Sequence, residues 1–151
     1  MKKLLTLGNI IKAGAVLFGL IAFFMMFTNQ AYVELLGNKS YVEFADAFFK
    51  DGGSPIGFVG YLLVLLAALA VCAFVVLPLF VKIEGKLVKI INLALAFVLL
   101  LGAIFILVEA AAINGVKDTE AYHLAAGPIV GGIFGIVSAL AVAASEFIPQ
   151  K

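Results

Sequence analysis

The sequence is poor in the residues that most often carry chemistry. It has no arginine and no tryptophan, and it has one cysteine and one histidine among 151 residues. One histidine and one cysteine cannot supply the ligands of an ordinary zinc site within one chain. The lone cysteine, Cys72, excludes an intrachain disulfide, and its place in an apolar run predicts a small buried side chain. We therefore expect no metal and no cofactor.

Charge is scarce as well. Ten lysines and nine acidic residues leave a net charge of +1. Binding to duplex nucleic acid requires a basic patch, so we expect no nucleic-acid partner. The absence of arginine also removes the bidentate recognition of phosphate and carboxylate groups that arginine provides.

Apolar residues are abundant instead. They make up 65% of the chain, against about 45–50% in soluble globular proteins. They form four runs of about 20 residues or more, the length needed to cross the hydrocarbon core of a bilayer. The sequence predicts an all-α integral membrane protein, a single four-transmembrane-helix bundle over residues 1–151. The predicted spans lie at about 7–28, 57–81, 87–112 and 124–147.

The first run begins like a secretory signal peptide, with Lys2 and Lys3 before apolar residues. It is interrupted by Lys12, however, and no small-x-small cleavage site follows Phe27. We therefore interpret the run as the first transmembrane helix, with the Lys12 side chain extending to the lipid headgroups.

The connection between the first two spans contains a helix signal. Ser40 and Glu43 have the spacing of a capping box, which marks the start of a helix. The residues that follow place aromatic side chains on one face, and the sequence DGGSP at 51–55 ends the pattern. We expect a short amphipathic helix at about 41–50 along the membrane surface in the first extracytoplasmic loop. It serves either as a lid over the spans or as a docking helix for a partner.

Lysine counts predict the orientation. Seven lysines fall on one side of the four spans and three on the other, so the positive-inside rule places both termini in the cytoplasm. The seven are Lys2, Lys3, Lys12, Lys82, Lys86, Lys89 and Lys151, and the three are Lys39, Lys50 and Lys117. We expect a multi-pass protein of the cell (plasma) membrane of a bacterium. This topology resembles that of the tetraspan claudin type, whose extracellular tryptophan and cysteine pair are missing here, so no site or activity is carried over.

The fourth run contains a row of small residues at every fourth position. They are Gly127, Gly131, Gly135, Ala139 and Ala143. Residues four apart lie above one another on a helix, and such rows let membrane helices approach closely. We interpret the row as a helix-packing groove, a glycine zipper that serves either another span of this chain or a neighbouring chain.

Three polar residues are the candidates for function. Glu109 is the one carboxylate inside a predicted span, near its outer end, where Lys117, His123 or the amides at the start of the fourth span are available as partners. A structural hydrogen bond and a role in transport are the two interpretations of Glu109. His123 is expected in a loop near the headgroups, and Asn92 is expected to form a hydrogen bond between helices.

Motifs of catalysis are missing from the sequence. It contains no Ser-His-Asp set, no acidic pair within the spans, no phosphate-binding loop and no cofactor fingerprint. We expect a non-enzymatic scaffold, accessory subunit or envelope component that assembles with itself or with a membrane-protein partner through helix contacts. The alternative is a small oligomeric channel or transporter with Glu109 in its pathway.

Overall fold

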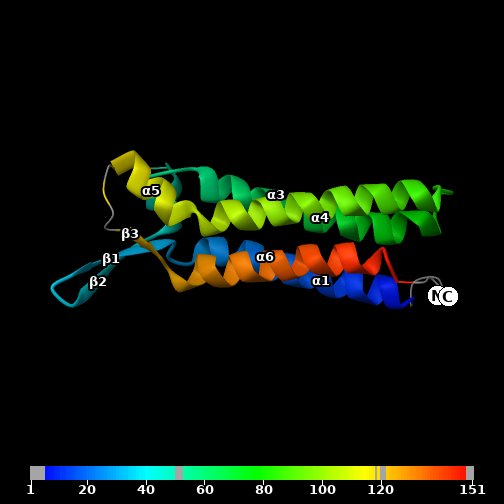
Figure 1. The fold of residues 1–151 in the computed structure, drawn as a ribbon, viewed down its shortest axis with the longest axis horizontal. Helices are drawn as coiled ribbons and strands as arrows, with labels where there is room; N and C mark the ends of the chain where they lie inside the picture. Colours follow the sequence, from blue (N-terminus) through cyan, green and yellow to red (C-terminus); the bar gives the residue numbers. More distant parts are fainter. Residues whose placement is uncertain (1–5, 50–52, 118, 120–121, 149–151) are drawn as a thin grey trace.

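A computed structural model describes residues 6–49, 53–117, 119 and 122–148 of the chain. Among these residues, four helices are long and apolar enough to cross a membrane, which indicates a multi-pass membrane protein. They are α1 (Leu7–Phe24), α3 (Ile56–Val76), α4 (Gly85–Leu107) and α6 (Ala126–Ser145). The four helices run side by side, and α1 and α4 each contact both α3 and α6 (Figure 1).

The shorter elements gather at one end of the four helices, which we call the sheet end (Figure 1). They are the 3-10 helix η1 (Met25–Phe27), the strands β1 (Ala31–Leu35), β2 (Asn38–Val42) and β3 (Tyr122–Leu124), and the helices α2 (Phe44–Phe49) and α5 (Glu109–Lys117). At the opposite end α1 begins, α6 ends, and the 3-10 helix η2 (Leu77–Leu79) leads into α4. We call it the lysine end because Lys82, Lys86 and Lys89 are exposed there.

The ends of the helices follow from local sequence. Thr6 caps α1, since its hydroxyl accepts a hydrogen bond from the Asn9 amide at 3.2 Å. Pro78 lacks an amide hydrogen, and α3 gives way to η2 around it. The third apolar helix ends at Leu107 rather than near residue 112, because Val108 leaves helical geometry and Glu109 begins the separate helix α5.

The sheet is a feature that the sequence analysis did not predict. Its strand order is β2-β1-β3, with both pairings antiparallel, so it joins the two loops at this end. Leu36 and Gly37 have φ angles of 52° and 81°, as the two central residues of a tight hairpin turn require. On one face the Tyr32 ring lies between the rings of Tyr41 and His123, at centroid distances of 6.0 Å and 5.3 Å.

The amphipathic helix expected at 41–50 is shorter than predicted. The extended chain continues through Val42, so Ser40 lies in β2 opposite Val33 instead of capping a helix. Helix α2 covers Phe44–Phe49, and position 50 lies outside the described residues. Phe48 is 3% exposed and packs on Tyr61, whereas Phe49 is 61% exposed, so the expected single aromatic face is divided.

The four long helices approach one another closely. A Cβ built at Gly60 of α3 would lie 2.6 Å from the Gly102 carbonyl oxygen of α4, and one at Gly102 would lie 2.7 Å from the Gly60 oxygen. These two glycines therefore bring the backbones of α3 and α4 into direct contact. Cys72 faces outward from α3 and is exposed, so the expectation that it is buried was wrong.

Candidate functional site

The row of small residues on α6 faces other helices of the same chain. Gly131 lies against Ala22 of α1 and Met25 of η1, and Gly135 lies against Ala103 of α4. Gly131, Gly135 and Ala139 are buried, whereas Gly127 and Ala143 are half-buried. Within the described residues, the row therefore packs α6 onto α1 and α4.

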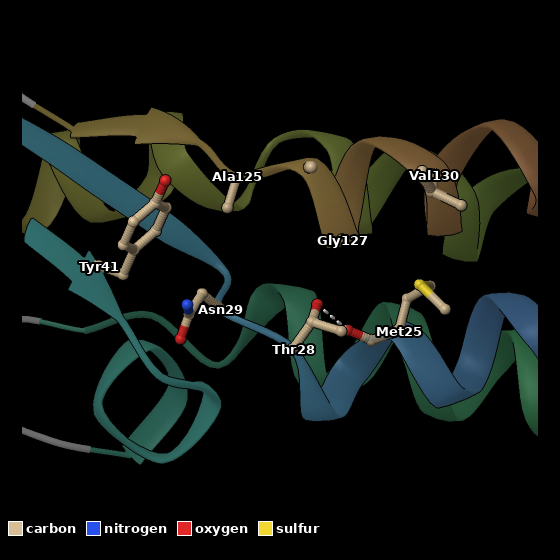
Figure 2. Close-up of a pocket in the computed structure, with 8 residues that line it drawn as sticks. Met25, Thr28, Asn29, Tyr41, Ala125, Gly127 and Val130 are labelled. Carbon is tan, nitrogen blue, oxygen red and sulfur yellow. Dashed lines mark hydrogen bonds between the residues drawn. The ribbon is translucent and has the colours of Figure 1, made fainter. Parts of the chain in front are cut away.

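A cavity of about 450 Å³ opens beside the first residue of this row. Figure 2 shows Gly127 on α6 and Thr28 after η1 on opposite walls, with the Thr28 hydroxyl donating to the Met25 carbonyl at 2.6 Å. A Cβ at Gly127 would collide with the Thr28 hydroxyl oxygen, so a larger residue here would have to displace the Thr28 side chain. The described residues that line this cavity include no carboxylate and no amine, and we assign it no chemistry.

Glu109 is fully buried at the junction of α4 and α5, just beyond the apolar helix α4. Its Oε2 accepts a hydrogen bond from the Gly57 amide at 2.8 Å, so it caps the first turn of α3. The sequence analysis proposed Lys117, His123 or the start of the fourth span as its partner, and the partner is instead the start of the second span. Its Oε1 is buried without a hydrogen-bond partner among the described residues. Burial raises the pKa of the Glu109 carboxyl to about 8, and the bond from Gly57 opposes that rise.

Gln30 connects the sheet to the helices, and the sequence analysis missed it. Its side-chain amide donates to the carbonyls of Met25, Met26 and Thr28 at 2.7–3.1 Å, which satisfies the end of η1. Its Oε1 accepts from the Tyr61 hydroxyl of α3 at 2.9 Å. Its backbone bonds to Val42 and Ala125, at the ends of β2 and β3. The sheet is thus held in a fixed position relative to the long helices.

A second polar cluster lies at the lysine end. The Lys12 ammonium of α1 is 2.6 Å from Glu146 Oε1 at the end of α6, and the two side chains are 7% and 9% exposed. The Asn92 amide of α4 donates to the same oxygen at 2.8 Å. Asn92 therefore bridges two helices, and Lys12 has in Glu146 an ion-pair partner that was not predicted. The sequence analysis missed Glu146, because nothing in its local pattern marks it.

The core between these two clusters is apolar. Ser138 is the one buried polar side chain there within the described residues, and its hydroxyl donates to the Ala15 carbonyl at 2.6 Å. The other buried side chains of this stretch include Val64, Ala67, Ala68, Val71, Leu99, Ala103 and Val142. Water needs a polar lining to pass along a membrane protein, and in the described core Ser138 is the one polar side chain.

His123 lies in β3 and not in an irregular loop, and it is exposed beside Tyr32. The described residues contain no group of three His, Cys, Asp or Glu side chains placed to hold a metal ion. Neither protein-family models, curated proteins nor solved structures give a match to this chain.

Proposed function

We propose that the protein is a non-enzymatic membrane scaffold, accessory subunit or envelope component that binds a partner through its sheet end. The observation that carries this proposal is the sheet itself, which Gln30 fixes to the helices through hydrogen bonds to η1, β2, Tyr61 and Ala125, the residue after β3. A surface held rigidly by its scaffold loses little entropy on binding, as a recognition surface requires.

Strand β2 offers the means of binding. It is an edge strand, and residues 38–41 are exposed. The tight turn pairs Leu35 with Asn38, so hydrogen bonds to β1 fall at alternate residues of β2. The amides of Lys39 and Tyr41 then face the open edge, where an extended segment of a partner pairs by strand addition.

The row of small residues on α6 supports the same view. Because Gly131 and Gly135 lie against α1 and α4 of this chain, the row serves the proposed four-helix bundle internally. Assembly with a neighbour then uses a different surface, and the sheet end provides one. The lysine distribution places this sheet outside the plasma membrane in our proposal, with both termini in the cytoplasm.

A matched pair of substitutions at Lys39 tests the proposal. Lys39→Pro removes the outward amide while sparing the hydrogen bonds to β1, whereas Lys39→Gln removes the charge and keeps the amide. We expect wild type and Lys39→Gln to co-purify with a partner from native membranes, and Lys39→Pro to lose it at unchanged thermal stability. The mass of the complex tells a second copy from another membrane protein. Retention of the partner by Lys39→Pro would rule out binding through the β2 edge.

The alternative, a small oligomeric channel or transporter, is favoured by one observation. Glu109 Oε1 is buried without a partner among the described residues, as an ion or proton site can be. Two observations disfavour it: the core is apolar, and Glu109 accepts a hydrogen bond from the Gly57 amide. Purified protein in sealed vesicles should carry no cation or proton flux above empty vesicles. A flux that Glu109→Gln abolishes would favour the channel.

A further inference from the structure

A cavity of about 240 Å³ opens at the lysine end, away from the sheet. Its walls come from the start of α1, the end of α3 with η2, the start of α4 and the end of α6. The residues that matter most are Asn9, Lys12, Phe74, Pro78, Val88 and Glu146. Two of these, Lys12 and Glu146, are the buried ion pair described above, so the cavity combines apolar walls with one cation and one anion.

The ion pair leaves hydrogen-bonding capacity unused. An ammonium has three N–H donors, and Glu146 is the one carboxylate paired with Lys12 in the described part of the chain. The contacts from Lys12 and Asn92 both fall on Glu146 Oε1, so Oε2 has no protein partner among the described residues. Buried charges are stable only when their remaining donors and acceptors are satisfied. The cavity is where a ligand would satisfy them.

The position of the pair along the helix indicates the source of the ligand. Lys12 is five residues beyond the start of α1, which corresponds to about 7.5 Å of helix. In a helix that crosses the bilayer, this position is near one end of the span, where a lysine side chain can reach a lipid headgroup, and not at the centre. Apolar residues beside the cavity are exposed, among them Leu79, Phe80 and Leu87. A lipid is therefore the molecule that meets both the apolar surface and the ion pair.

We propose that this cavity binds the headgroup of a phospholipid with a primary amine, of the phosphoethanolamine type. A phosphate oxygen of the lipid accepts from Lys12 Nζ, and its ammonium donates to Glu146 Oε2. The acyl chains lie on the exposed apolar surface beside the cavity.

Charge and donor chemistry select this headgroup over its relatives. The paired site has no net charge, so a zwitterion enters without introducing an unbalanced charge. A phosphoglycerol headgroup is anionic and brings its charge close to Glu146. A phosphocholine headgroup is zwitterionic, but its quaternary ammonium has no N–H to donate to Glu146. Both should bind more weakly than phosphoethanolamine, roughly tenfold or more, the value of a charge-assisted hydrogen bond.

The experiment uses the full chain, stripped of lipid in detergent, and short-chain phosphatidylethanolamine, phosphatidylcholine and phosphatidylglycerol as probes. Native mass spectrometry measures the bound lipid, and thermal unfolding measures stabilisation. We expect phosphatidylethanolamine to bind most tightly and to raise the unfolding temperature. Free O-phosphoethanolamine, which lacks acyl chains, should bind much more weakly.

Three variants locate the site. Lys12→Met/Glu146→Gln removes both charges together and should lose the preference among the three lipids. Gly85→Phe places a large side chain at the cavity wall, where a Cβ meets no heavy atom within 4 Å, and should weaken binding while leaving the ion pair intact. Lys86→Met removes an exposed lysine at the same end, outside the cavity lining, and should bind as wild type does.

Several results would overturn the proposal. Equal binding of phosphatidylethanolamine and phosphatidylcholine would show that the amine is not recognised. Tighter binding of phosphatidylglycerol, lost in Lys86→Met, would show attraction of anionic lipid to the exposed lysines instead. Equal binding of free O-phosphoethanolamine would make the ligand a soluble molecule. Unchanged binding of phosphatidylethanolamine in Gly85→Phe, together with an unchanged lipid preference in the double variant, would place the lipid elsewhere. None of these readouts depends on the sheet end. A failure of the lipid proposal would therefore leave the proposed partner binding through the sheet untouched, and the reverse also holds.

Discussion

The two ends of the long helices use buried polar groups in different ways. At the sheet end, Glu109 and Gln30 bond to backbone groups near helix ends, namely the Gly57 amide and three carbonyls after α1. At the lysine end, the charged side chains of Lys12 and Glu146 bond to each other and border a cavity. Polar groups committed to the backbone hold the fold, whereas a charge pair facing a cavity retains capacity for a ligand. In our proposals, the sheet end positions a surface for a partner and the lysine end binds the polar group of a lipid.

The largest loss of unfolding free energy is expected for a substitution at the lysine end. Lys12→Met leaves Glu146 buried without its cation, and breaking a buried ion pair costs about 3–5 kcal/mol of unfolding free energy. Lys12→Met/Glu146→Gln removes both charges and should recover most of that loss. Unfolding in detergent measures both variants, with Lys86→Met at an exposed position as the control. A loss for Lys12→Met no greater than for Lys86→Met would mean that the pair does not form.

The stretch between the ends should respond to side-chain size. Leucine in place of Gly102 would push against the Gly60 backbone of α3, and leucine in place of Gly131 against α1. Overpacking of this kind costs about 1–3 kcal/mol, with Gly102→Leu at the upper limit because backbone cannot move aside. Ile136→Leu, off the row on α6, should cost less.

Unfolding and oligomer size are measured together for these three variants. Loss of stability without a change of oligomer size indicates packing inside one chain. Equal results for Gly131→Leu and Ile136→Leu would show that the small-residue row does not determine helix packing. The close contacts between the long helices would then not be what holds the two ends in their relative positions.

The long helices were predictable, and the polar clusters were not. Apolar runs of spanning length predict helices directly, because a lipid-exposed backbone must satisfy its own hydrogen bonds. The predicted helix ends were less accurate. Helix α4 ends just before Glu109, which accepts a hydrogen bond from Gly57, and that contact joins residues far apart in the sequence. Lys12 was assigned to the headgroups because its partner Glu146 lies at the far end of the chain.

The sheet was missed for a related reason. Strand β3 has three residues, too few for a periodic pattern, and β1 and β2 are short and only partly apolar. The Ser40–Glu43 spacing favoured a helix start, but pairing of β2 with β1 overrides that local signal. The Leu36–Gly37 turn was the available clue, since glycine after a short β-rich run is typical of a hairpin.

A pH effect should appear at the sheet end, where Glu109 is buried. Burial raises the pKa of Glu109 from 4.5 to about 8, so between these values the folded protein holds a proton that the unfolded chain has lost. The stability from this group is therefore complete below about pH 4.5 and is lost as the pH rises through about 8. We expect a lower unfolding temperature at about pH 9 than at about pH 6 in wild type, and less difference in Glu109→Gln. The change should be smaller than for Lys12→Met, because the hydrogen bond from the Gly57 amide stabilises the charged form of Glu109. The same pH dependence in Glu109→Gln would assign the titration to another group.

The last prediction assigns each end to a side of the membrane and should leave stability unchanged. In a Cys72→Ala background, Lys39→Cys introduces a thiol at the exposed edge of the sheet, and Lys86→Cys introduces one at the exposed lysine end. The seven-to-three division of lysines predicts that an impermeant thiol reagent labels the Lys39→Cys variant in intact cells. The Lys86→Cys variant should react only after the cells are permeabilised. The reverse pattern would place the sheet in the cytoplasm and the lipid cavity in the outer leaflet. The chemical contrast between the two ends would survive that result, since it rests on contacts within the chain, but the partner of the sheet would then have to be cytoplasmic.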